Sequence, residues 1–388
     1  MAAIENGSVT SSSRRADRSL LAAALLLPGV LPLAQQAHAE AAPEQAVVAA
    51  KVLDYQDRQP GLERTHVQAP AVYLLLPIRG EWSLEASLVQ DSVSGASPRY
   101  HTSISSASRQ TERRSAGDVK LTHYAARQSW YAGAAVSDEH DFHSRALSGG
   151  ASFSSEDNNR TLNLGAAFTE DRIGATGDPT LDARRRTMQV MGGVTQNVSP
   201  RDIVQGSLTL SRGTGFYDDP YKFPDHRPDQ RNQLVAAARW NHHVESHGAT
   251  LRSGYRYYAD SFGIRAHTVD AEWVQPVGSR WRITPGVRYY TQQAARFYVD
   301  PVYDAVLGEP FPPGWTPGTI SSPDQRLSAF GALSASLKLD VTLDAAWAMD
   351  LKLERYEQRA DWRLGGKGSP GLAPFSARWV QLGVSYRF

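Results

Sequence analysis

The chain has 388 residues, 41% of them hydrophobic, and a mean hydropathy of −0.42. This value is too low for a bundle of membrane helices, and beyond the N-terminal segment no run reaches the roughly 18 apolar residues that a spanning helix needs. The absence of cysteine excludes disulfides, thiol catalysis and covalent haem attachment to this chain. The formal net charge of +1 argues against nucleic acid as a partner and against a strongly ion-selective pore.

The N-terminal segment has the three parts of a secretory signal peptide. Arg14, Arg15 and Arg18 form a basic region, residues 20–33 an apolar region, and Ala37-His38-Ala39 a small-residue cleavage site. We therefore expect residues 1–39 to be removed and residues 40–388 to form a single mature domain. Removal takes away three arginines and two acids (Glu5 and Asp17), so 41 basic and 40 acidic residues become 38 of each.

The mature chain is expected to be an all-β protein. Short segments of alternating apolar and polar residues, separated by turn residues, are typical of transmembrane β-strands. Sixteen such segments are predicted: 47–57, 66–77, 80–91, 117–127, 129–138, 143–154, 160–171, 185–197, 201–212, 230–243, 249–260, 264–275, 280–293, 325–340, 343–357 and 375–388. This pattern predicts a transmembrane antiparallel β-barrel of about 16 strands.

The connections between these segments alternate between short and long. Tight turns are expected at 77–80, 127–129, 156–159, 198–200, 243–248, 278–279 and 340–342. The other connections are mostly longer: 58–65, 92–116, 172–184, 213–229, 294–324 and 358–374, with 139–142 and 261–263 as short exceptions. Since short turns face the periplasm in bacterial barrels, an even strand count places both termini there.

Tryptophan positions agree with this orientation. Trp82, Trp130 and Trp281 begin strands that run up from the periplasmic end, while Trp240 and Trp273 end strands that run down to it. All five are expected in one interfacial girdle. Phe168, Tyr257 and Tyr289 are expected at the opposite rim.

The last predicted strand, residues 375–388, has one apolar row on alternate positions and ends on an aromatic residue. The row consists of Val380, Leu382, Val384, Tyr386 and Phe388. We expect it to face lipid, and the ending resembles the strand by which the barrel-assembly machinery recognises outer-membrane barrels. The sequence therefore predicts a barrel in the bacterial outer membrane, with its lipid and that machinery as partners.

Residues 191–222 read MGGVTQNVSPRDIVQGSLTLSRGTGFYDDPYK. Together with the terminal SYRF they resemble a bacterial family of outer-membrane proteins catalogued as domain of unknown function 3570. The resemblance covers the mature chain and implies fold and location, but no activity. The stretch is expected to hold a tight turn and the start of an outer loop, with these residues as the family-motif positions: Ser199, Pro200, Arg201, Asp202, Gly213, Gly215, Phe216, Asp219 and Pro220.

Charged residues alternate with the apolar rows and are expected to line a wet lumen. The candidates are Arg252, Arg256, Asp270, Glu272, Arg282, Arg288, Asp344, Asp350, Lys352 and Glu354. Adjacent strands carry basic, then acidic, then basic residues. Two roles are open for them: an interior ion-pair network, or a transverse field that orients a dipolar solute.

Other clusters have simpler interpretations. Asp218, Asp219, Asp225, His226 and Asp229 suit cation binding, but lie beside prolines as turn-forming residues do. The histidines at 242, 243 and 247 resemble a metal cluster, yet neighbours on a strand point to opposite faces. We expect no metal and no cofactor. No catalytic motif occurs in a convincing context, so we expect no enzyme.

The function predicted from the sequence is porin-like passage of a small polar solute through a charged lumen. The first alternative is a structural or docking barrel that engages a surface partner through loops 92–116, 294–324 and the aromatic segment 310–318, or that holds a periplasmic protein. An outer-membrane enzyme is the second alternative.

Overall fold

A computed structural model describes residues 41–95, 110–222, 224–300, 311 and 314–388. The predicted signal peptide lies outside the described residues, as do the centre of the 92–116 connection and residues 310, 312 and 313 of segment 310–318. In the described part of the chain, no helix is long and apolar enough to cross a membrane.

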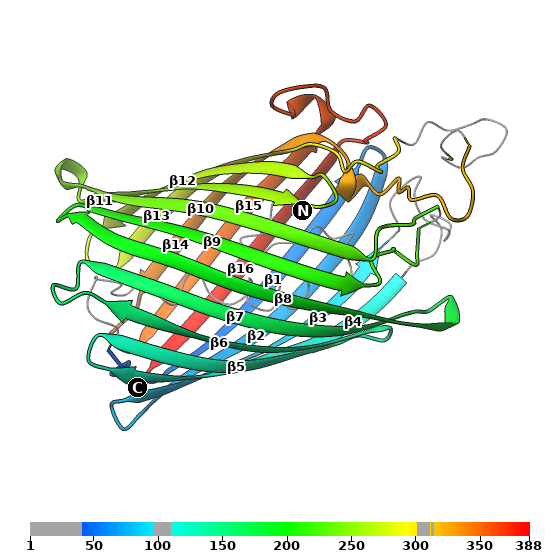
Figure 1. The fold of residues 1–388 in the computed structure, drawn as a ribbon. Coiled ribbons are helices and arrows are strands. Elements are labelled where there is room, and N and C mark those ends of the chain that lie inside the picture. The colour runs from blue at the N-terminus through cyan, green and yellow to red at the C-terminus, as the bar shows by residue number, and fades with distance from the viewer. Residues whose placement is uncertain (1–40, 96–109, 223, 301–310, 312–313) are drawn as a thin grey trace.

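The described residues form sixteen antiparallel strands that close into one barrel (Figure 1). The strands are β1 (Val47–Gln59), β2 (Leu62–Ile78), β3 (Trp82–Gly95), β4 (Gln110–Ala125), β5 (Gln128–Asp138), β6 (Phe142–Ser154), β7 (Arg160–Ala175), β8 (Asp178–Ser199), β9 (Asp202–Gly215), β10 (Gln230–Val244), β11 (Ala249–Asp260), β12 (Arg265–Val277), β13 (Trp281–Gln292), β14 (Phe330–Thr342), β15 (Trp347–Arg359) and β16 (Phe375–Arg387). The sixteen-strand prediction is confirmed, with every predicted segment overlapping one strand.

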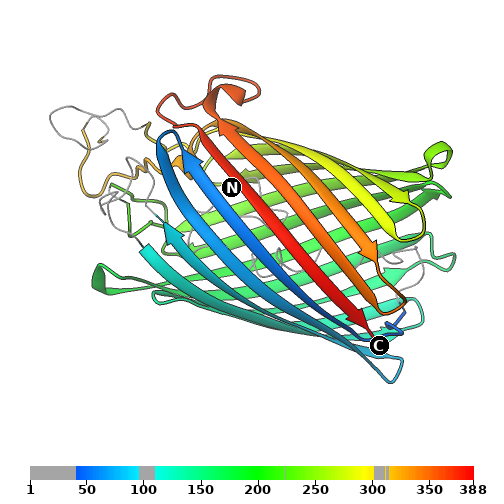
Figure 2. The same ribbon diagram turned by 180° about the vertical axis from the view of Figure 1, so that it is seen from behind.

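The last strand closes the barrel against the first (Figure 2). The backbones of Ala46 and Phe388 exchange hydrogen bonds of 2.9 and 3.1 Å, so both ends of the described chain lie at the same rim. Val380, Leu382, Tyr386 and Phe388 are 36–60% exposed and Val384 is half-buried. Their row therefore faces outward, as expected, while Ala377 and Trp379 on the opposite face are buried.

The outer surface of the barrel is apolar over its middle. Leu88, Leu147, Met188, Val269 and Val287 are each more than half exposed there. A soluble protein would bury such side chains, since each Å² of apolar surface removed from water is worth about 25 cal/mol. An apolar exterior around a polar interior is the pattern of a membrane barrel.

Seven tight turns join even-numbered to odd-numbered strands, and we call their rim the turn end and the opposite rim the loop end. Exposed tryptophans gather at the turn end: Trp82, Trp130, Trp240 and Trp281, with the half-buried Trp273. The single girdle predicted for these five is confirmed. It also includes Trp347, which was not among the tryptophans predicted for the girdle and whose ring lies 4.7 Å from that of Tyr386.

Two connections predicted to be long are wrong. β1 and β2 are joined by residues 60–61 alone, and β7 and β8 by residues 176–177. In the β7–β8 hairpin, Arg172 and Asp182 pair across the two strands with Nε–Oδ1 at 2.7 Å, so these charged residues extend the hairpin. The strand ends that the β3–β4, β9–β10, β13–β14 and β15–β16 connections join all lie at the loop end.

Two strand starts were also predicted too early. Residues 325–327 form a short 3₁₀-helix, because the Asp324 side chain accepts a hydrogen bond from the Arg326 amide at 3.0 Å. Asp344 lies in the β14–β15 turn, where its carboxylate accepts hydrogen bonds from the amides of Ala346 and Trp347 at 2.8 and 2.7 Å. Asp344 is therefore a turn residue, and its predicted place in the lumen row is wrong.

Candidate functional site in the barrel lumen

The other nine lumen candidates lie on inner rows of the strands. Their neighbours along the chain point out, since Tyr255, Val269, Val287 and Leu353 are 42–59% exposed on the apolar surface. Strand alternation then turns the charged residues inward: Arg252, Arg256, Asp270, Glu272, Arg282, Arg288, Asp350, Lys352 and Glu354.

An ion-pair network covers the inner wall from β13 to β1. Asp340 lies directly opposite Asp350, and Lys338 opposite Lys352, so each like-charged pair needs counter-charges. Lys338 Nζ lies 2.7 Å from Asp340 Oδ1, and Lys352 Nζ 2.8 Å from Glu354 Oε2. The expected interior network therefore exists, but on β13–β15 and β1 rather than centred on β11–β13.

This network crosses the closing strand at Gly383. Lys51 Nζ on β1 reaches Asp350 Oδ2 on β15 at 3.4 Å, with β16 between them. A Cβ atom at position 383 would lie 2.4 Å from Asp350 Oδ1 and 2.9 Å from Lys51 Cε. The absence of a side chain there lets the ion pair lie across the strand.

The wall from β10 to β13 carries more positive than negative charge. Arg239, exposed on the inner face of β10, is added to the predicted Arg252, Arg256, Arg282 and Arg288. Against these five arginines stand two acids on β12, Asp270 opposite Arg288 and Glu272 opposite Arg252. Arg239 was not among the predicted lumen residues, although the even-numbered apolar residues of β10 (Leu234, Ala236, Ala238 and Trp240) indicate that it faces inward.

A smaller charged group lies on β2–β5. Lys120 Nζ is 2.6 Å from Glu85 Oε1, and the Tyr73 hydroxyl donates to Glu85 Oε2 at 3.1 Å. Lys120 also lies 5.9 Å from the ring centroid of Tyr131. That ring lies flat on the wall because Gly150 leaves room for it: a Cβ there would be 2.5 Å from the ring.

The opposite wall is polar but uncharged. On the inner faces of β5 to β9, the described residues below the Asp171–Arg185 pair at the loop end carry no charge. Ser152 donates to Asn163 at 2.7 Å and Gln205 to Thr195 at 3.2 Å. Since β7 and β15 lie eight positions apart in a sixteen-strand ring, this wall faces the ion-pair network.

Aromatic side chains fill the lumen near the loop end beside the charged wall. The cluster includes Tyr55, Tyr290, Phe330, Tyr356 and Trp379, all on inner rows and at most 9% exposed. Tyr356 and Tyr290 donate to Gln358 at 2.9 Å and Gln292 at 2.5 Å, so their hydroxyls are satisfied. The layer narrows the lumen from one side.

The β9–β10 loop crosses the loop end of the barrel. Tyr221 binds Asp141 in the β5–β6 turn and accepts a hydrogen bond from the Thr176 amide at 2.8 Å. The next residue, Lys222, binds Asp324 in the β13–β14 loop with Nζ–Oδ1 at 2.7 Å. Because β5–β6 and β13–β14 lie on opposite sides of the ring, this loop bridges the opening.

A buried ion cluster holds the crossing in place, with Asp324, 0% exposed, at its centre. Arg227 Nη2 lies 2.7 Å from Asp324 Oδ2 and 2.9 Å from Asp225 Oδ2. Arg326 also contacts Asp324, and reaches Asp219 Oδ2 at 2.6 Å. Sequence reasoning missed this loop cluster, since its members lie about a hundred residues apart and only their charge is visible in the sequence.

The charged residues of the loop cluster shift one another's pKa values. Burial favours a raised pKa for Asp324, but Arg326, Lys222 and Arg227 outweigh burial and hold that pKa well below its ordinary value. Burial lowers the pKa of Lys222 and raises that of Asp225. Asp324 therefore stays ionised as the shared counter-ion of three cations.

The family-motif residues build the hairpin that leads into this loop. In the turn, Ser199 donates to Asp202 at 2.6 Å, and Arg201 Nε lies 2.7 Å from Glu245 Oε1. Ser199, His242 and Trp240 donate to Asp202 and lower its pKa to about 2. The His242 ring is thus hydrogen-bonded to a carboxylate, with Nδ1–Oδ1 at 2.8 Å.

At the other end of the hairpin, Gly213 and Gly215 make room for the loop. A Cβ at position 213 would meet the Tyr217 hydroxyl at 1.9 Å, and Gly215 has φ 120°. Phe216 then donates its amide to Arg184 O at 3.0 Å. Asp219, with Pro220 after it, belongs to the loop cluster, so Asp219 and Asp225, two of the acids considered for cation binding, pair with arginines.

The closed ring, apolar exterior and charged interior define an outer-membrane-type β-barrel. The chain belongs to the family of proteins of unknown function DUF3570, which matches residues 102–184 and 178–379. The predicted family is confirmed. No curated protein matches the sequence.

Solved structures with a similar fold are bacterial barrels. They include CdiB from Acinetobacter baumannii (TM-score 0.49, 10% identity, 87% of this chain and 60% of CdiB). Two others are OccK2 (OpdF) from Pseudomonas aeruginosa in complex with glucuronate (0.46, 11%, 89% and 98%) and the CymD monoaromatic hydrocarbon channel (0.44, 9%, 89% and 89%). This chain thus spans 60% of the length of CdiB, and the likeness concerns the fold.

Proposed function

We propose that this protein is an outer-membrane pore for small polar solutes, with its turn end and both termini in the periplasm. The observation that carries the proposal is the lumen itself. A charged wall of β10–β15 and β1 faces an uncharged polar wall of β5–β9, and inner residues on both sides, such as Ser148, Gln205 and Arg239, are exposed to solvent. Barrels with a wet, polar interior conduct solutes.

The loops set the size of the solute. The bridging β9–β10 loop and the aromatic layer at β12–β1 both reduce the opening at the loop end. A solute enters beside the bridge and then passes between the two unlike walls. The arrangement therefore favours small polar molecules over oligomers.

Liposome swelling with protein purified from membranes tests the proposal. Vesicles containing the barrel should swell in isotonic arabinose much faster than in stachyose, and empty vesicles should not swell in either. Planar bilayers should show discrete conductance steps. No swelling and no steps from a heat-modifiable, folded barrel would refute the pore.

The docking barrel is the competing function, and the observation that favours it is the bridge of the β9–β10 loop across the loop end rather than the lumen. Purification from membranes discriminates the two. A stoichiometric companion on a barrel that never conducts would support docking, whereas a solitary conducting barrel supports the pore.

A further inference from the structure

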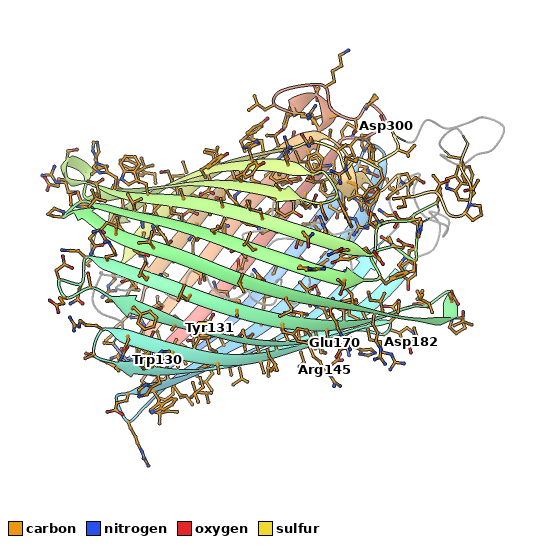
Figure 3. The ribbon with its side chains drawn as sticks, viewed as in Figure 1. Trp130, Tyr131, Arg145, Glu170, Asp182 and Asp300 are labelled. Carbon is orange, nitrogen blue, oxygen red and sulfur yellow. The ribbon has the colours of Figure 1, made fainter. Side chains whose placement is uncertain are left out.

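The outer surface of β6–β8 carries a group of arginines that neither the lumen nor the loops use. Arg145 on β6, Arg172 on β7, and Arg184 and Arg186 on β8 point outward and are all exposed. Figure 3 places Arg145 with Glu170 and Asp182 toward the loop end of the barrel, whereas Trp130 lies toward the turn end. We call these four residues the arginine patch.

Strand register fixes the shape of the patch. Arg145 lies opposite Glu170, and Glu170 opposite Arg186, which makes one row across three strands. His143, Arg172 and Arg184 form the next row toward the loop end. Neighbouring strands are about 4.8 Å apart and successive outward residues about 6.8 Å apart, so the four guanidinium groups share a compact area.

An apolar row lies directly below the patch, toward the turn end. It consists of Leu147, Phe168 and Met188, which are 65%, 39% and 66% exposed and lie side by side in register. The patch therefore begins one residue pair beyond the last row that lipid chains cover. This is the level at which lipid headgroups sit.

The charge at this level is positive. Arg186 pairs with Glu170 at 3.0 Å, Arg172 with Asp182 at 2.7 Å, and His143 with Asp138 at 2.9 Å. The two rows of the patch, with Asp138 opposite His143 and with Asp182 paired to Arg172, hold four arginines and three carboxylates, which leaves a net charge of +1 with histidine neutral. Guanidinium groups bind phosphate in a bidentate manner, so such a surplus suits a phosphorylated headgroup.

We propose that the arginine patch binds the phosphate groups of an anionic membrane lipid whose acyl chains lie on Leu147, Phe168 and Met188. The inference rests on the proposed membrane location but not on conduction. It gives the barrel a bound lipid on the β6–β8 side, opposite the ion-pair network of the lumen. Ionic strength should weaken the contact, because exposed charges are screened.

The experiment compares two double variants of the whole protein purified from membranes. Arg145→Gln/Arg184→Gln removes two charges from the patch. Arg160→Gln/Arg280→Gln removes two exposed arginines at the turn end and is the matched control. Binding of diphosphoryl lipid A is measured by native mass spectrometry, with dephosphorylated lipid A and inorganic phosphate as separate probes.

The patch variant should bind diphosphoryl lipid A at least about tenfold more weakly than the parent, and the control should bind as the parent does. Dephosphorylated lipid A should bind weakly to all three. Equal binding by patch variant and parent would overturn the proposal. So would inorganic phosphate that binds the patch as well as the lipid does, or equal retention of both lipids.

Failure here is distinguishable from failure of the pore. If the barrel conducts but binds both forms of lipid A equally, the lipid site is refuted and the pore is not. If the barrel binds the lipid through the patch but never conducts, the pore is refuted and the lipid site is not.

Discussion

At the scale of single residues, Gly215 is a position where the structure of the loop end depends on the absence of a side chain. Its φ of 120° is open to glycine, and a Cβ there would lie 2.1 Å from the backbone oxygen of Arg184. Gly215→Ala should lower the free energy of unfolding by more than about 2 kcal/mol, from backbone strain plus displacement of β8. Urea titration of the barrel in lipid vesicles, followed by tryptophan fluorescence, measures it.

Gly206 on the same strand supplies the control. A Cβ at that position has its nearest neighbour 4.0 Å away, at Val194 Cγ1. Gly206→Ala should therefore leave the urea midpoint unchanged or slightly raised, because alanine loses less backbone entropy on folding. Equal midpoints for the two variants would contradict the role given to Gly215.

Residue faces were predictable wherever a strand alternates cleanly, which is why nine lumen candidates lie inside. The lumen prediction for Asp344 was wrong for a local reason. Its carboxylate accepts hydrogen bonds from two turn amides, and the sequence alone does not distinguish such a turn residue from a lumen residue. Arg239 and Trp347 were predictable from the same alternation and were missed. The crossing of Lys51 and Asp350 over Gly383 was not predictable, because it needs the strand register.

At the scale of elements, the bridging loop depends on Asp324. Asp324→Asn removes the shared carboxylate of Lys222, Arg227 and Arg326 while leaving these cations buried. Breaking a buried ion pair costs about 3–5 kcal/mol, so the loops should separate. Limited proteolysis should then cut residues 216–229, and single-channel current should become larger and noisier.

An exposed ion pair gives the comparison for that variant. Glu156, 93% exposed, lies 3.5 Å from Arg127 at the turn end. Glu156→Gln should change neither proteolysis nor current, because such pairs contribute little. A bridge that stays intact in Asp324→Asn would show that the loop cluster does not hold it.

The loop cluster also predicts how the bridge responds to acid. The folded pKa of Asp324 is depressed, so its contribution is fully present above the unfolded value of about 3.9 and is lost only as pH falls through the lower folded value. Burial raises the pKa of Asp225, so Asp225 protonates before Asp324 as the pH falls. Asp324 then still forms ion pairs with Arg227, Arg326 and Lys222. Protease resistance of residues 216–229 should therefore persist from pH 7 to about 4. Loss near pH 6 would contradict it.

Strands were predictable as elements because their period of two repeats sixteen times. The predicted strand boundaries were wrong where charged residues extend a strand beyond its apolar part, as in the β7–β8 hairpin. They were also wrong where a loop folds back on the barrel. The 3₁₀-helix at residues 325–327 was read as strand because Asp324, which caps it, is fixed by partners on another loop. Loop structure thus depended on contacts about a hundred residues away that carry no local signal.

At the scale of the whole molecule, charge is balanced overall but unevenly placed. The wall of β14, β15 and β1 pairs its lysines with carboxylates. Below the Arg231–Asp260 pair at the loop end, by contrast, the wall of β10–β13 has five arginines against two acids. A field of one sign close to one wall attracts counter-ions even when the net charge is near zero. The pore should therefore show a weak preference for anions.

The double variant Arg239→Gln/Arg252→Gln tests where this preference arises. It removes two of the five arginines and leaves the network of Lys51, Asp340 and Asp350 intact. In a tenfold KCl gradient the reversal potential of the parent should indicate anion preference, and that of the variant should move toward the cation side. Arg160→Gln/Arg280→Gln, which removes the same charge outside the lumen, should keep the parent value. Equal shifts of the reversal potential in the variant and in the control would assign the preference to surface charge, because the two control arginines lie outside the lumen.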